Sequence, residues 1–387
     1  MSPLVIIFIT VFIDLLGFGI IIPLLPFYAE TFGASAFLIG LLSTSFSLMQ
    51  FLFAPIWGRL SDRYGRRPII VIGLFGSGIS YVAFGLATSL TMLFLARILS
   101  GIAGANIPTA QAFIADSTPP EQRARGMGLI GAAFGLGFIF GPAIGGFLSQ
   151  WGYAAPALFA AALSFANFLA ALMLLPESLP PERRGQIQRR GRLEVFRHAL
   201  TRPGLGLVLG VFFLVTTAFA SFESMFALFA EIRFGFGPTT IGYLFAGVGV
   251  VLALVQGVLV GKVVPLLGER RVVPLAIFLM GFALVAQALA TSVPWLAVGM
   301  GLLAAGMGFH SPSMLAVISR LADATNQGST LGLSQSLASL GRIVGPLWAG
   351  FVFDHYGPAM PFYTSSGLML VACVLSVVVF RLKGMGE

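Results

Sequence analysis

Twelve stretches of the sequence are long and apolar enough to cross a lipid bilayer, and this pattern limits the fold more than any other feature. A spanning helix needs about 20 mostly apolar residues. The stretches are 4–28, 38–58, 69–88, 91–113, 124–148, 153–175, 206–230, 239–260, 272–291, 295–318, 329–353 and 360–381. Only 9% of the residues are charged, and a soluble protein of this composition would expose large apolar patches. The chain is therefore predicted to be an all-α integral membrane protein, because lipid admits only helices or closed barrels and these runs lack the alternation of barrel strands.

The basic residues are divided unevenly between the loops. With both termini placed in the cytoplasm, 19 of the 22 Lys and Arg residues fall in cytoplasmic loops, and Arg233 alone falls in an outer loop. Membrane proteins concentrate basic residues on the cytoplasmic side. This bias predicts a multi-pass protein of the cell (inner) membrane with both termini inside. It also accounts for the net charge of +8 without a nucleic-acid partner.

The sequence contains weak internal repeats. Three pairs of segments resemble each other at offsets of 202 to 204 residues: FGASAFLIG (32–40) and FGFGPTTIG (234–242), GRLSDRYGRR (58–67) and GKVVPLLGERR (261–271), GPAIGGF (141–147) and GPLWAGF (345–351). Two similar halves around a central site are common in secondary transporters.

The repeats define three regions. We predict an N-terminal six-helix bundle (1–178), a cytoplasmic linker rich in arginine and proline (179–204) and a C-terminal six-helix bundle (205–387).

The sequence lacks the patterns of common enzyme and cofactor sites. Cys373 is the single cysteine, no H-E-x-x-H pattern occurs, and no G-x-x-x-x-G-K-[ST] phosphate loop is present. We predict no metal, no cofactor and no enzymatic activity.

The segment GRLSDRYGRRP joins the second and third predicted spans. Gly58 allows close helix approach, Gly65 allows a sharp turn, and Asp62 can meet a helix N-terminus or an arginine. On spacing alone, an ordinary basic loop is an equally good interpretation.

This segment resembles the G-x-L-[AS]-D-R-x-G-R-[KR] signature of the major facilitator superfamily, and the likeness extends over the whole chain. The resemblance implies twelve helices in two pseudo-symmetric halves, and a cytoplasmic latch in which Asp62, Arg66 and Asp116 lock the outward-facing state. The implied gate comprises Gly58, Asp62, Arg63, Gly65, Arg66, Asp116 and Arg342, although Arg342 has an equally good structural interpretation.

The fifth predicted span carries small residues at a spacing that favours close helix packing. The residues concerned are Gly137, Gly141, Pro142, Gly145 and Gly146. Packing alone would explain them. The pattern G-x-x-x-G-P-x-x-G-G also resembles the antiporter motif of drug exporters, which implies export.

Asp14 lies inside the first span, where a charge costs about 2.5–3.5 kcal/mol on insertion scales. Its surroundings, DLLGFGIIIPLLP, are similar to the first span of tetracycline-efflux proteins in the drug:proton antiporter branch. Arg97 and Gly101 resemble that branch's R-x-x-x-G motif, whose arginine is tied to proton transfer. Asp14 is predicted to alternate between pairing with Arg97 and losing that partner, or else the two form a fixed structural pair.

Glu223 in the seventh span lies among phenylalanines. It is a second candidate for proton coupling, an anchor for cationic substrates through charge and cation–π attraction, or a satisfied buried acid. The predicted substrate cavity comprises Asn106, Gln111, Phe222, Phe226, Gln256 and His310. For His310 a structural role is the stronger alternative, and for the amides interhelical hydrogen bonding is an alternative.

We predict a proton-coupled exporter of lipophilic or cationic drugs that works as a monomer by alternating access, with small molecules, protons and the bilayer as partners. Spans 239–260 and 272–291 lack the titratable residues that tetracycline exporters carry there, which argues against metal–tetracycline as the substrate. The alternatives are an exporter of a sugar, a metabolite or an amphiphilic lipid, and a membrane receptor or scaffold that transports nothing.

Overall fold

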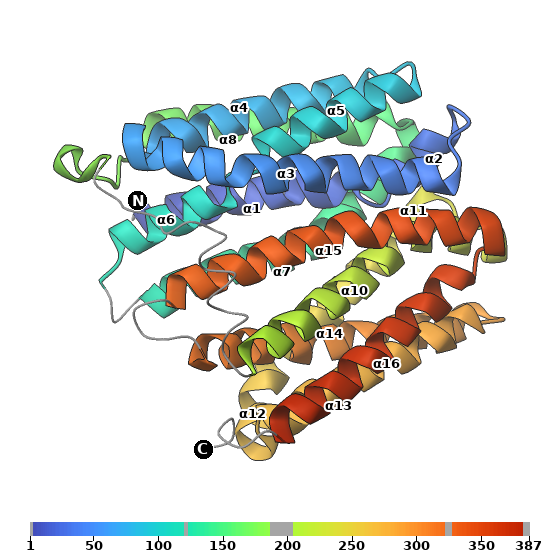
Figure 1. Ribbon diagram of the computed structural model, residues 1–387. Helices are drawn as coiled ribbons and strands as arrows, with labels where there is room; N and C mark the ends of the chain where they lie inside the picture. Colours follow the sequence, from blue (N-terminus) through green and yellow to red (C-terminus); the bar gives the residue numbers. More distant parts are fainter. Residues whose placement is uncertain (1–2, 120–122, 186–203, 322–326, 382–387) are drawn as a thin grey trace. The chain divides into compact units, whose positions relative to one another are not determined.

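The computed structural model describes residues 3–119, 123–185, 204–321 and 327–381, and every element in these ranges is a helix (Figure 1). Twelve of the described helical segments are long and apolar enough to cross a membrane. The prediction of a twelve-span all-α protein is confirmed. Of the predicted linker, residues 186–203 lie outside the described ranges.

The helices form one continuous series along the chain. Their bounds are α1 (Pro3–Ile21), α2 (Leu25–Glu30), α3 (Ala36–Tyr64), α4 (Arg66–Gly85), α5 (Leu90–Ala103), α6 (Ile107–Ser117), α7 (Arg123–Leu148), η2 (Ser149–Trp151), α8 (Ala154–Leu174), η3 (Pro181–Arg183), α10 (Leu205–Phe234), α11 (Pro238–Leu254), η4 (Val255–Leu259), α12 (Val260–Leu267), α13 (Glu269–Ala288), α14 (Val293–Leu321), α15 (Gln327–Tyr356) and α16 (Met360–Arg381).

The spans are apolar on both their packed and their exposed faces. On α4, Leu74 is 2% exposed and packs in the core, while Ile72 and Phe75 on the other side are 52% and 45% exposed. A helix that is apolar all round is stable when lipid covers its outer face. The exposed face of α4 is therefore a lipid-facing surface.

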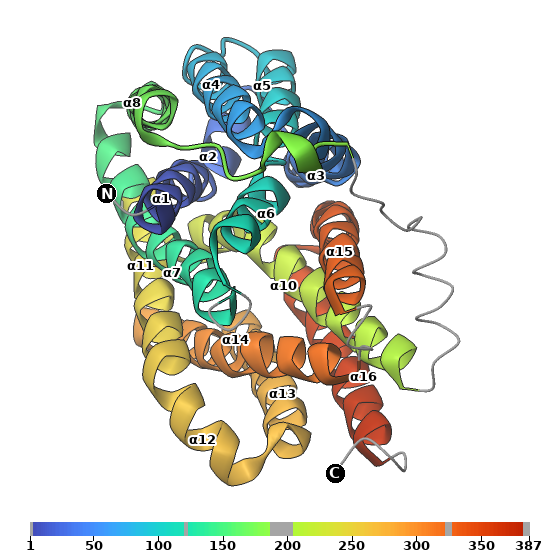
Figure 2. The same cartoon turned by 90° about the vertical axis from the view of Figure 1, so that its left-hand side faces the viewer.

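Two compact units make up the described chain. Unit 1 contains Met1–Ala34, Leu42–Gln188 and Phe236–Ala246, and unit 2 contains Ser35–Leu41, Arg189–Gly235 and Gly247–Glu387. In unit 1, α1 packs against α7, and α4 packs against α5 and α8 (Figures 1 and 2). In unit 2, α10 packs against α15, and α13 packs against α14 and α16. The two units repeat one packing pattern, as the sequence repeats predict.

Glycines bring α7 close to α1. A Cβ at Gly141 would lie 2.7 Å from the Cα atom of Gly19, and a Cβ at Gly145 would lie 2.4 Å from the carbonyl oxygen of Ile20. Gly137 similarly faces Leu15. The absence of side chains at these positions permits backbone-to-backbone packing within unit 1.

The first turn of α3 belongs to unit 2, where it packs against α15. Its N-terminal amides are capped from the other helix: Asp354 accepts hydrogen bonds from the backbone N–H groups of Ala36 at 3.1 Å and Phe37 at 2.9 Å. A carboxylate at this position satisfies two of the amides that a helix start leaves without partners.

Among the boundaries that differ from the predicted spans, two lie close to predicted site residues. The first span, predicted as 4–28, ends at Ile21 and is followed by the short helix α2, because Pro23 has no N–H to continue the hydrogen-bond ladder. The predicted loop between the second and third spans is reduced to Gly65, since α3 continues to Tyr64 and α4 begins at Arg66. Most of the signature segment is therefore helical.

Candidate functional site

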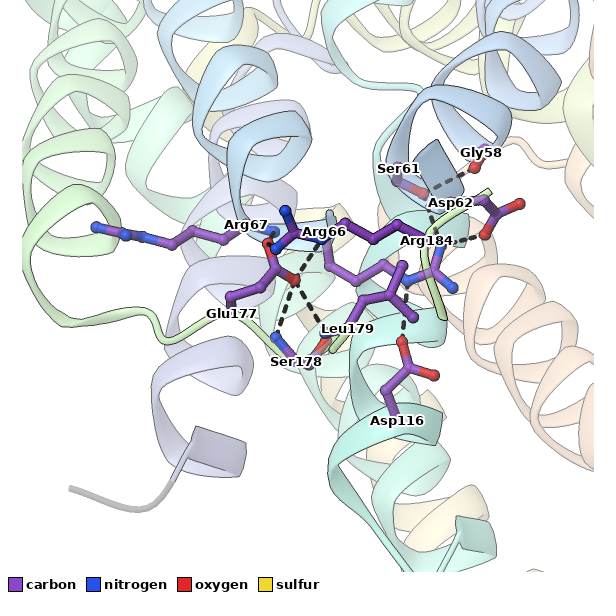
Figure 3. A network of polar contacts seen from close by, with 10 residues as sticks. All are labelled: Gly58, Ser61, Asp62, Arg66, Arg67, Asp116, Glu177, Ser178, Leu179 and Arg184. Atoms are coloured by element: carbon purple, nitrogen blue, oxygen red, sulfur yellow. Dashed lines mark hydrogen bonds and ion pairs between the residues drawn. The ribbon is translucent and has the colours of Figure 1, made fainter. Parts of the chain in front are cut away.

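Five of the seven predicted gate residues gather around the guanidinium group of Arg66, at the start of α4 (Figure 3). Arg66 forms an ion pair with Asp62 on α3, and its Nε donates a hydrogen bond to Oδ2 of Asp116 on α6 at 2.9 Å. It also donates to Oγ of Ser61 at 2.8 Å, and Ser61 donates to the carbonyl oxygen of Gly58. The Arg66 side chain is only 3% exposed. One buried cation thus joins three helices.

Gly65 holds the turn between α3 and α4. Its φ is +108°, and a Cβ atom there would lie 2.2 Å from Oε2 of Glu177. Glu177 accepts hydrogen bonds from the backbone N–H groups of Arg66 at 2.9 Å and Arg67 at 3.3 Å. The turn needs glycine both for its backbone conformation and because a capping carboxylate occupies the place of a side chain.

Residues after α8 complete the gate network. Nη2 of Arg184 lies 4.0 Å from Oε2 of Glu177, and the backbone N–H of Gly185 donates to the carbonyl oxygen of Asp62 at 2.9 Å. Leu179, between them in the sequence, is buried. The first part of the predicted linker is therefore packed against the gate in unit 1.

Two predicted gate residues lie apart from this network. The guanidinium of Arg63 lies 5.4 Å from the ring centre of Tyr64. Arg342 belongs to unit 2, on α15, where it donates a hydrogen bond to Oγ of Ser339 at 3.0 Å. Its gating role stays a prediction.

Asp14 is half-buried on α1, in the interior of the first span. Its Oδ1 accepts a hydrogen bond from Oγ of Ser77 on α4 at 3.3 Å. Within the described ranges no ion pair joins it to a cation. A carboxylate held by a single hydroxyl can exchange a proton when its surroundings change.

Arg97 on α5 is 5% exposed, and its guanidinium lies 4.4 Å from the ring centre of Phe46. It forms no ion pair with Asp14 in the described residues. Tyr81 interacts electrostatically with both Asp14 and Arg97, and its ring packs on Gly17, one turn after Asp14. The aspartate and the arginine are thus in one electrostatic environment without direct contact.

Asn106 and Gln111 flank the start of α6. The fourth span is broken between α5 and α6, and Asn106 lies in this break, 5% exposed, with no hydrogen-bond partner for either amide atom. Gln111 is half-buried.

Glu223 on α10 is half-buried and interacts electrostatically with Arg342 of α15. The phenylalanine rings beside it in sequence point elsewhere: Phe222 and Phe226 are 1% and 0% exposed, and Phe222 packs edge-on against Phe362 of α16. These two rings form part of the core of unit 2, so their role in a cavity stays a prediction.

The two remaining cavity candidates differ in exposure. His310 on α14 is 1% exposed, lacks a partner at both ring nitrogens and stacks on Phe212 with ring centres 6.4 Å apart. Gln256 is exposed and lies in η4, a π-helical segment, and such segments frequently occur at functional sites.

Sequence comparison now identifies the family. The model of the Major Facilitator Superfamily matches residues 7–265 and 233–385. The chain belongs to the major facilitator superfamily. It is 31% identical over 376 residues to multidrug resistance protein 2 of Bacillus subtilis, covering 95% of this chain and 92% of the relative. It is 35% identical over 352 residues to the class C tetracycline resistance protein of Escherichia coli, covering 89% and 88%.

A transporter of known structure has the same fold as this chain. The human organic anion transporter MFSD10 (TETRAN) is 28% identical, covers 97% of this chain and 99% of its own, and superposes with a TM-score of 0.76. This major facilitator protein is thus a multi-pass membrane transporter of small molecules.

The sequence did not reveal Ser77 or Glu177 as site residues. Ser77 carries no motif of its own, and only its place on α4 brings it to Asp14. A signal for Glu177 was available: it is an acid directly after Pro176, at the end of the sixth predicted span.

Proposed function

We propose that this protein exports lipophilic or cationic drugs from the cell in exchange for protons. In this proposal it works as a monomer in the inner membrane, with both termini in the cytoplasm. The names of its relatives support the substrate class, because both bacterial relatives are drug resistance proteins. The excess of arginine and lysine in alternate loops supports the orientation.

The single observation that carries proton coupling is the environment of Asp14. A carboxylate within a spanning helix is expensive and marks a proton relay by default. Asp14 has one hydroxyl partner, Ser77, and a buried arginine nearby but not paired with it. A carboxylate ionises where water or a cation reaches it and keeps its proton where neither does. Alternating access would move Asp14 between these two conditions.

The proton gradient is sufficient for such export. One pH unit is worth about 1.36 kcal/mol per proton, and 100 mV about 2.3 kcal/mol per charge. For one proton exchanged with one uncharged drug molecule, the two terms together sustain a drug gradient of roughly several hundredfold. Exchange for a singly charged cation moves no net charge, so the pH difference alone drives it and sustains about tenfold.

A second candidate is export of a sugar, another metabolite or an amphiphilic lipid by the same coupling. Buried polar groups without partners favour it, because Asn106 and His310 could bind a polar substrate. The exchange reaction itself is common to both candidates.

The test uses purified protein in liposomes that contain a pH-sensitive dye. Tetraphenylphosphonium and tetracycline are added outside, and proton flux is compared between wild type, Asp14→Asn and Glu223→Gln. Asp14→Glu serves as the control that keeps a carboxylate. We expect drug-triggered flux in wild type and Glu223→Gln, and none in Asp14→Asn.

The other results are equally informative. Flux that survives in Asp14→Asn but not in Glu223→Gln would assign coupling to the acid of α10. Absence of flux with every drug would reject drug exchange, and labelled sugars and fluorescent lipids would then test the second candidate.

A further inference from the structure

A fourth pair of similar segments carries buried polar side chains that have no hydrogen-bond partners in the part of the chain that the structure describes. G-A-N-I-P-T (104–109) at the break between α5 and α6 corresponds to G-F-H-S-P-S (308–313) in α14, 204 residues later. Both follow the pattern glycine, x, Asn or His, x, proline, Thr or Ser. The repeat keeps polar chemistry at two positions in the middle of apolar helices.

The first segment lies in unit 1. Asn106 is 5% exposed and Thr109 is 0% exposed, and neither amide atom of Asn106 nor Oγ1 of Thr109 has a hydrogen-bond partner. The Asn106 side chain occupies the space that Gly73 leaves open, since a Cβ at Gly73 would lie 1.8 Å from Nδ2 of Asn106. One turn further along α4, Ser77 donates to Asp14. The segment therefore lies next to the proposed proton site.

The second segment lies in unit 2 and repeats these features. His310 is 1% exposed and Ser313 is 2% exposed, and both ring nitrogens and Oγ of Ser313 lack partners. Phe212 stacks on one side of the imidazole, and Gly308 packs on Val255, where a Cβ would lie 2.9 Å from the Cβ atom of that residue.

Proline adds an acceptor to each segment. Pro108 has no N–H, so the carbonyl oxygen of Gly104, four residues earlier, loses its helical partner. Gln50 on α3 donates to that oxygen at 3.2 Å. Pro312 removes the partner of Gly308 in the same way. Each segment thus offers side-chain donors and acceptors beside a kinked backbone.

Unpaired polar groups at such depth are costly unless something binds them. We propose that the two segments are matched binding sites for a neutral oxygen that both donates and accepts hydrogen bonds, supplied by water or by a hydroxyl group of the substrate. Among the described residues, the atoms without partners belong to an amide, two hydroxyl groups and an imidazole, which are groups that suit a neutral oxygen. Buried waters commonly make about three such bonds. If the substrate supplies the oxygen, the two segments are part of the proposed export function and the inference rests on that function. If water supplies it, the inference is independent of export.

The test removes each polar group without changing its volume. Thr109→Val and Ser313→Ala are compared with Thr10→Val and Ser221→Ala, whose buried hydroxyls are already bonded to the carbonyl oxygens of Ile6 and Gly345. If an oxygen is bound, Thr109→Val and Ser313→Ala lower the melting temperature as the controls do. If the sites are empty, both substitutions raise it, because they remove an unsatisfied group.

Two further measurements identify the source of the oxygen. A high-resolution map of the drug-free protein shows an ordered water within hydrogen-bond distance of Asn106 and Thr109 if water is the source. If the substrate is the source, Thr109→Val and Asn106→Leu weaken binding of tetracycline by about fivefold or more. Binding of tetraphenylphosphonium, which has no hydrogen-bonding group, is unchanged.

The proposal is overturned if Thr109→Val and Ser313→Ala are stabilising, no water occupies either segment and the ratio of the two drug affinities is unaltered. The stability and map measurements need no transport, so failure of the export function and failure of these sites are told apart.

Discussion

The start of α4 and the start of α13 carry the same ion pair with opposite signs. Arg66 pairs with Asp116 near the end of α6, and Glu269 pairs with Arg320 near the end of α14. The corresponding residues are 203 and 204 apart in the sequence. Each pair joins the first turn of one span to the last turns of its neighbour. The repeat therefore preserves an attraction between these helices while exchanging its charges.

The two pairs differ in burial and in number of partners. The side chain of Arg66 is 3% exposed and shared with Asp62, whereas the side chain of Arg320 is 62% exposed. Pro265 stands where the first copy has Asp62. Ion pairs in solvent contribute little, but a buried charge needs its partners. The first copy is therefore the better candidate for the predicted latch.

Replacing the two arginines gives the largest predicted difference between the copies. Arg66→Gln removes the buried cation that pairs with both Asp62 and Asp116, which should lower the free energy of unfolding by about 3–5 kcal/mol. Arg320→Gln should lower it by no more than about 1 kcal/mol. Denaturant titration in mixed micelles measures both. Equal losses would show that burial does not separate the two copies.

The glycines before the two helices provide the next comparison. Gly65 has φ +108° and ψ 161°, and Gly268 has φ +72° and ψ 154°, a region that essentially only glycine adopts. Substitution by alanine should cost about 1–3 kcal/mol at each. Gly65→Ala should cost about 1 kcal/mol more, because it also displaces Glu177, whereas nothing lies within 4 Å of a Cβ at Gly268. The same titration measures the difference.

Substitutions of Glu177 test whether its hydrogen bonds to the first amides of α4 or its negative charge stabilise the first copy. Glu177→Ala removes the acceptor for the N–H groups of Arg66 and Arg67 and should cost about 1–2 kcal/mol. Glu177→Gln keeps an oxygen acceptor and should cost about half as much. A Glu177→Gln protein as unstable as Glu177→Ala would assign the effect to the charge alone.

Exchanging the two charges within the exposed pair should give the smallest change in stability, and the same exchange in the buried pair separates the two copies directly. Glu269→Arg combined with Arg320→Asp should restore stability to within about 0.2–1 kcal/mol of wild type, since the exposed pair has no third member. Arg66→Asp combined with Asp116→Arg should not recover, because the new acid would face Asp62. Thermal melting of the wild type, the two double variants and their four single variants completes the two cycles.

Much of the architecture could be predicted from the sequence. The twelve apolar runs follow directly from the thickness of the bilayer, and Asp62, Gly65 and Arg66, which the structure brings into one network, stand within one short segment. Interactions between residues that are close together in the sequence could therefore be predicted from the sequence alone.

Two kinds of feature could not be predicted from the sequence. One joins residues that are far apart in the sequence, and the other is an ion pair whose charges are reversed between the two repeats. Glu177 is 111 residues from Arg66, so no spacing rule connects them. The inverted pair of Glu269 and Arg320 escapes a search for similar letters, because the residues share a role and not a charge. Phe222 and Phe226, beside Glu223, are predicted cavity residues that lie in the core of unit 2, and periodicity alone cannot tell a core stripe from a cavity lining.

The cap that Asp354 provides for α3 can form only late in biosynthesis, because Asp354 is synthesised long after α3. Ala36 leaves the ribosome 318 residues before its partner carboxylate. At about 5–20 residues per second, that interval lasts roughly 15–60 s. Throughout it, the first amides of α3 must be hydrated, although most of the helix has already been made. The native start of the second span is therefore among the last features of unit 2 to form, and a nascent chain stalled before α15 carries every residue of α3 without its native cap.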